Sequence, residues 1–165
     1  MRLLAKNTTA IARSSDLVWR VTVEVEDWPK WTPTVTKVVR LDQGPFGAGS
    51  AVKLKQPAQL ETTWRVTSFD DGHAFTWMAK VYGIPMVAGH EIIETPHGSD
   101  SFMTIHVSGF AAFALWPLIK VIVGRAIALE NRSLKAWCET LDDRSHTGSP
   151  NDWHQSAEPV YDANA

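Results

Sequence analysis

The sequence predicts one α+β domain in which a seven-stranded antiparallel sheet curves around a long C-terminal helix. Two observations lead to this class. Six consecutive segments between residues 35 and 108 alternate apolar and polar side chains, the period of a half-buried strand, and turn residues separate them. One long helical pattern follows at residues 111–141, so a single helix must cover the apolar face of the sheet. Wrapping the sheet around that helix would leave a cavity between them.

The elements before the six segments are shorter. Residues 2–12 are the expected first strand, and Ser14 begins N-cap chemistry for a short helix over residues 17–21. Two prolines interrupt residues 25–33, which excludes a long helix and favours a second short helix or a turn.

The six remaining strands share the period-two pattern and the short connections of an antiparallel meander. They are expected at residues 35–41, 51–56, 61–68, 75–82, 86–93 and 103–108. Asp71-Gly72, between the third and the fourth of them, is a strong hairpin signal.

The C-terminal helix is expected to be amphipathic in its second half and apolar nearly all round in its first half. Residues 143–165 are polar and lack periodicity. We therefore divide the chain into a ligand-binding domain at residues 1–142 and a tail at residues 143–165 that is expected to be poorly ordered.

Composition narrows the function classes. A length of 165 residues with 44% hydrophobic residues fits one globular core. A net charge of −2 gives no basic footprint for nucleic acid. The single cysteine, Cys138, excludes an internal disulfide framework and fits a cytoplasmic protein. The most apolar segment, residues 109–124, is too short for stable membrane insertion.

The chain contains eight tryptophans, a high number for its length, and this side chain suits a cavity wall as well as a core. Strand parity places a large aromatic surface on the inner face of the sheet, opposite the apolar start of the helix. We expect a small hydrophobic or aromatic molecule to bind there, with a filled core as the alternative. The expected ligand-binding residues are Trp31, Trp64, Trp77, Met86, His90, Met103, Phe113 and Trp116.

Several short motifs resemble the START-like (SRPBCC, helix-grip) superfamily, and the nearest branch is similar to the polyketide cyclase/dehydrase and lipid-transport family. The resemblance covers about residues 4–141. Its motifs are Val18-Trp19, Trp28-Pro29-x-Trp31-x-Pro33, Gly47-x-Gly49, Trp64-x-Val66, Phe75-x-Trp77, His90 and Glu130-x-x-x-Leu134-Lys135. It implies a helix-grip fold and a lipid-like or polyketide-like ligand; members include both carriers and aromatic cyclases.

A cyclase or dehydratase acting on a polyketide-like substrate is the enzymatic alternative, since such chemistry needs a proton donor or acceptor in the cavity. By parity His90 is the only titratable residue of the inner face, and Glu130 is its only plausible carboxylate partner. A hydrogen-bonded core histidine is the competing interpretation of His90. The resemblance implies an inward arginine in such cyclases, whereas Arg65 has the outward parity.

No HExxH motif or Cys/His cluster is present, so no metal site and no cofactor are expected. The apolar first half of the helix suggests a third class, an interaction module. That surface would suit a homodimer face, a partner helix or a membrane-touching gate, and the sequence does not choose among them.

Overall fold

The structure is a computed structural model that describes residues 1–57 and 59–142. Its elements are β1 (Arg2–Ile11), α1 (Ser15–Val23), η1 (Val25–Asp27), α2 (Trp28–Trp31), β2 (Lys37–Arg40), β3 (Ala51–Lys55), β4 (Thr62–Asp70), β5 (Ala74–Val81), β6 (Ile84–Thr95), β7 (Gly98–Val107), α3 (Phe110–Ala114) and α4 (Trp116–Thr140). The expectation for residues 143–165 lies outside the described residues.

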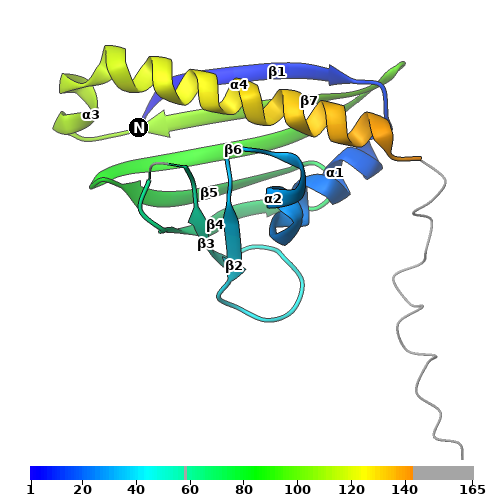
Figure 1. Cartoon of the computed structure of the whole chain (residues 1–165), viewed down its shortest axis with the longest axis horizontal. Helices are drawn as coiled ribbons and strands as arrows, with labels where there is room; N and C mark the ends of the chain where they lie inside the picture. The colour runs from blue at the N-terminus through cyan, green and yellow to red at the C-terminus, as the bar shows by residue number, and fades with distance from the viewer. Residues whose placement is uncertain (58, 143–165) are drawn as a thin grey trace, which may run out of the picture.

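The sheet has seven antiparallel strands in the order β1-β7-β6-β5-β4-β3-β2. Every pair except β1–β7 joins neighbours in the chain, so the meander predicted from the short turns is confirmed. Figure 1 shows α4 running along β1 and β7, while the remaining strands bend away beneath it and α1 and α2 close one end.

The core lies between the inner face of the sheet and α4. Every second residue is buried from Ile84 to Ile92 in β6 and from Ser99 to Val107 in β7, as a two-residue period requires. From α4, Ile127, Leu134 and Cys138 complete this core. None of the helices in residues 1–57 and 59–142 is both long and apolar enough to cross a membrane.

Two details depart from the sequence pattern. A register shift between Val66 and Ser68 interrupts the pairing of β4 with β5. Ser68, which has the same strand parity as the inward Trp64, is therefore exposed, and Phe69 packs against the core instead. The single helix expected at residues 111–141 is broken at Leu115, which has φ −101° and ψ 13°. Pro117 cannot donate a helical hydrogen bond, but it fits the first turn of a new helix.

Candidate functional site

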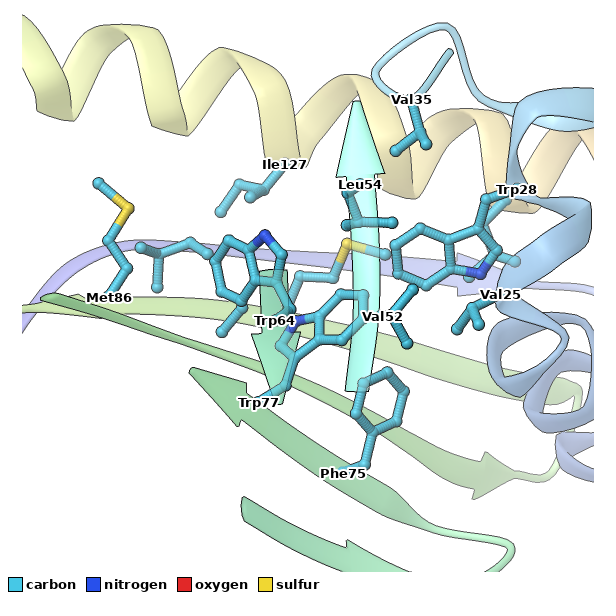
Figure 2. Close-up of a cluster of buried hydrophobic side chains, with 14 of the residues drawn as sticks. Val25, Trp28, Val35, Val52, Leu54, Trp64, Phe75, Trp77, Met86 and Ile127 are labelled. Atoms are coloured by element: carbon cyan, nitrogen blue, oxygen red, sulfur yellow. The ribbon is translucent and has the colours of Figure 1, made fainter. Parts of the chain in front are cut away.

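A small cavity of about 60 Å³ lies between the sheet and α4. Trp64, Trp77 and Met103 contribute to its wall from the sheet, and Ile127 and Glu130 contribute from α4. Figure 2 shows Trp64 and Trp77 between Ile127 and Phe75. The volume has room for a few water-sized groups, whereas pockets for drug-sized ligands measure roughly 300–1,000 Å³. The aromatic side chains thus fill most of the space that the sequence suggested as a binding cavity.

The wall is a continuous set of aromatic contacts. Trp77 lies 5.3 Å from Trp64 and 5.3 Å from Trp28, measured between ring centroids. The His90 ring stacks on Phe75 at 4.8 Å and lies 5.5 Å from Trp28. These rings come from β4, β5, β6 and α2, and strand parity turns the first three sets inward. The aromatic rings on the sheet side of the site are therefore closely packed.

A buried polar network crosses this aromatic wall. Thr34 Oγ1 donates to Glu130 Oε2 at 3.1 Å, and the Thr32 and Thr34 hydroxyls share a hydrogen bond of 2.9 Å. His90 Nε2 lies 3.4 Å from Glu130 Oε1. The network joins α4, the loop after α2 and β6. Sequence reasoning placed Glu130 beside His90 as a candidate partner but missed both threonines, because no periodic pattern orients the side chains of a loop.

Burial favours the uncharged form of both ionisable groups. Loss of solvation lowers the pKa of His90 from 6.5 to about 4. The same loss raises the pKa of Glu130 from 4.5 to about 7, although the hydrogen bond from Thr34 acts in the opposite direction. His90 is therefore a neutral imidazole near pH 7, and Glu130 is the group that gains or loses a proton in the neutral range. Glu130 is buried, so its carboxyl group does not lie on the solvent-exposed flank of the helix.

Several buried polar atoms near the cavity have no hydrogen-bond partner among the described residues. The indole nitrogens of Trp31, Trp64 and Trp77 and the His90 Nδ1 atom lack a hydrogen bond among residues 1–57 and 59–142. In contrast, Trp28 Nε1 donates to the Thr22 carbonyl oxygen at 3.1 Å. An indole nitrogen can only donate, so the unused groups of Trp64 and Trp77 suit an acceptor atom.

The structure brings together Trp64, Trp77, His90 and Met103 at the cavity. Met86 and Trp31 are buried in the same core but do not line it. Trp31 instead packs against Trp28, with ring centroids 5.8 Å apart.

Phe113 and Trp116 do not face the inner tryptophans as expected. Their rings stack on each other at 5.9 Å, and the Arg2 guanidinium lies 4.8 Å from the Trp116 ring. The break at Leu115 separates Phe113 from the helix that covers the sheet. The helical residues opposite the sheet tryptophans are Ile127 and Glu130, further along α4.

A larger hollow of about 610 Å³ lies at the outer surface beside η1, with Glu24, Asp27, Asp71 and Phe46 among its lining residues. It is open to solvent, whereas the smaller cavity is where buried polar groups converge, so we place the candidate site at the smaller one. Within the described residues, no group of three or more His, Cys, Asp or Glu side chains could hold a metal ion.

Solved structures share this fold at low sequence identity. The aromatase/cyclase Zhui from Streptomyces is 16% identical, with a TM-score of 0.64 over 82% of this chain and 92% of that one. A START superfamily protein from Mycobacterium smegmatis is 14% identical, with a TM-score of 0.67 over 85% of this chain and 99% of that one. The di-domain aromatase/cyclase StfQ of the steffimycin pathway is 11% identical, with a TM-score of 0.70; the match covers 84% of this chain but only 51% of StfQ.

No curated protein matches the sequence. The family model for polyketide cyclase/dehydrase and lipid transport matches residues 4–139, which spans the sheet and nearly all of α4. The chain therefore belongs to the polyketide cyclase/dehydrase and lipid-transport family.

Proposed function

We propose that this protein binds one small, mostly apolar molecule carrying a hydrogen-bond acceptor in the cavity between the sheet and α4. The observation that carries the proposal is the pair of unpartnered indole N–H groups of Trp64 and Trp77 at a mostly apolar cavity wall. A buried donor without a partner costs about 1–3 kcal/mol. A carbonyl or phenolic oxygen of a ligand would recover part of that cost.

The cavity must enlarge for a ring-sized ligand to enter. Met103 and Ile127 line the present volume, and methionine readily changes its rotamer. The helix α4 packs mainly on β1, at the edge of the sheet, and we expect these contacts to persist when Ile127 moves outward. The family supports this role, since its description includes both polyketide cyclases and lipid transport.

Binding can be tested with a naphthalene ketone whose fluorescence depends on the polarity of its surroundings. We expect a Kd in roughly the micromolar range. Trp77→Phe keeps an aromatic ring but removes the donor, which should weaken binding by about five-fold, or about 1 kcal/mol. Met78→Ala is the control, because Met78 lies next to Trp77 on the exposed face of β5. Equal effects of the two substitutions would contradict the proposal.

The role of His90 in binding can be tested in the same assay. We expect its neutral ring to hold one polar atom of the ligand, so His90→Phe should preserve the fold and lower the affinity by about 1 kcal/mol. Unchanged affinity would exclude His90 from the site.

Acid–base catalysis is the second candidate, favoured by a pKa of about 7 for Glu130 beside His90 in the cavity. A cyclisation or dehydration of a polyketide-like substrate would then use Glu130 as the proton donor or acceptor, with His90 as its partner. Glu130→Gln should reduce turnover by roughly 10²–10⁴-fold and leave probe binding intact. An activity that survives this substitution would exclude the catalytic role.

A further inference from the structure

The helices α3 and α4 carry a large apolar surface that no described part of the chain covers. Phe110 is 88% exposed, Leu118 is 59% exposed and Ile122 is 55% exposed. We call the exposed apolar residues of the two helices the α3–α4 apolar face. Its main members are Phe110, Phe113, Leu118, Val121, Ile122 and Leu129. Exposed apolar surfaces of this extent mark interaction sites.

Helical spacing shows that this surface is separate from the core. Leu118, Ile122 and Leu129 recur at the i, i+4 and i+11 positions of one stripe, with Arg125 at i+7. Val123 and Ile127 lie on the other side of α4 and pack against the core. The first half of α4 is therefore apolar on two sides, and the sheet occupies one of them.

Charge is unevenly distributed around this surface. Residues 1–11, 74–90 and 101–129 contain no aspartate or glutamate, although the chain has 18 acidic residues. The three segments meet at one end of the sheet, where Arg2 pairs with Val107 and Ser108 N donates to the Pro85 carbonyl oxygen at 3.1 Å. Their basic residues are Arg2, Lys6, Lys80, Lys120 and Arg125. A chain of net charge −2 thus has a basic, apolar end.

We propose that the α3–α4 apolar face docks on the surface of an anionic lipid membrane. Helices that lie in the membrane interface combine an apolar face with lysine and arginine side chains. Each such basic side chain near an anionic surface contributes about 1 kcal/mol to the binding free energy. Trp116, under the Arg2 guanidinium at 4.8 Å, is an aromatic side chain of the kind that prefers the headgroup region. This inference concerns a surface and does not depend on a ligand in the cavity.

A second copy of the chain fits the same surface poorly. A symmetric dimer places the same patch of both subunits in contact. Arg125 lies within the stripe and Lys120 and Arg2 lie near it, so the two subunits would bring like charges into one interface. Like charges in contact oppose association, whereas anionic headgroups would neutralise them.

The test is co-sedimentation of the full chain with vesicles of phosphatidylglycerol and phosphatidylcholine in equal parts, compared with pure phosphatidylcholine. We expect binding to the anionic vesicles that weakens as salt is added. Ile122→Glu should reduce the partition coefficient by about tenfold or more, because the substitution replaces an apolar side chain that enters the membrane interface with a charged one that does not. Lys120→Gln should reduce it by about fivefold.

Leu60→Glu is the matched control, because Leu60 is 73% exposed but lies between β3 and β4, outside the three segments. All variants change exposed side chains, and thermal unfolding should confirm that each remains folded. Equal binding to both vesicle types, or equal loss for Ile122→Glu and Leu60→Glu, would overturn the proposal. So would a dimer in sedimentation equilibrium that Ile122→Glu converts to a monomer.

Discussion

His90 and Glu130 share one buried network, and burial shifts their pKa values in opposite directions. The folded state holds the pKa of His90 near 4 and that of Glu130 near 7, against 6.5 and 4.5 for the free groups. For His90 the unfolded chain binds more protons between pH 4 and 6.5, so this residue makes the free energy of unfolding rise as pH rises. For Glu130 the folded chain binds more protons between pH 4.5 and 7, so this residue makes the free energy of unfolding fall as pH rises.

The two effects should nearly cancel between pH 4.5 and 6.5, which predicts a flat free energy of unfolding in that window. Glu130→Gln removes one effect, and stability should then rise by about 2 kcal/mol across the window because only His90 remains. His90→Gln should give a fall of similar size. Urea unfolding at a series of pH values measures all three proteins.

Asp42 and Glu139 do not complicate this comparison. Their pKa values are lowered, that of Asp42 to about 2, so their influence is confined to more acidic conditions.

On regular elements, the predicted list shares Trp64, Trp77, His90 and Met103 with the cavity lining but omits Trp28, Leu54 and Ile127. Parity along β6 placed His90 on the inner face, and helical position placed Glu130 near it. Thr32 and Thr34 escaped prediction because they lie in the loop after α2, where side-chain direction depends on tertiary packing. The error at Phe113 and Trp116 came from extending one helix through a break whose position a single proline does not specify.

At the scale of elements, the β6–β7 turn contains Gly98, which has the least room for an added side chain among the described glycines. Gly98 adopts φ +139°, and a Cβ at this position would collide with the backbone oxygen of Ile11, on the neighbouring end of β1. The turn therefore needs glycine for both its backbone conformation and the closeness of β1.

Gly98→Ala should lower the free energy of unfolding by about 3 kcal/mol or more, combining strain of the left-handed region with steric overlap. Gly72→Ala is the comparison, since Gly72 has φ +82° but no heavy atom lies within 4 Å of the place that an added methyl group would occupy. That substitution should cost only about 1 kcal/mol. Chemical denaturation measures both, and similar losses would show that steric overlap at Gly98 is unimportant.

Strand existence followed from the period of two, but the register shift in β4 did not. A bulge is a property of two paired strands, so the sequence around Thr67 does not predict that Ser68 points outward. The same limit applies to the length of β2, which spans four residues in place of the seven expected.

At the scale of the whole molecule, hydrogen bonds connect the C-terminal end of α4 to the segment that follows β1. The Arg13 side chain donates to the carbonyl oxygens of Leu141 at 2.9 Å and Glu139 at 2.7 Å. Cys138, the only cysteine, is fully buried beside this junction. Its thiol should be inert to a disulfide reagent until the helix end separates from the core.

Arg13→Met should raise the native-state labelling rate of Cys138 by about tenfold, since hydrogen bonds from a charged donor contribute about 1.5–3 kcal/mol. Arg65→Met is the control, because Arg65 donates to the Gly49 carbonyl oxygen on the opposite side of the sheet. Equal labelling of both variants would indicate that the helix end is held by packing alone.

The volume of the cavity is the property of the whole molecule that the sequence could not supply. Parity identifies which side chains point inward but not how closely they pack, and the aromatic rings leave about 60 Å³. A pattern of inward tryptophans is therefore compatible with an open pocket and with a nearly filled core.

The chain of indole contacts has an optical consequence. Trp31, Trp28, Trp77 and Trp64 follow one another with centroid separations of 5.8, 5.3 and 5.3 Å. At such separations the electronic transition dipoles of neighbouring indoles couple, and their fixed tilts make the coupling chiral. The protein should consequently show a strong exciton signal in circular dichroism, and any change that rotates one indole would alter its sign or shape.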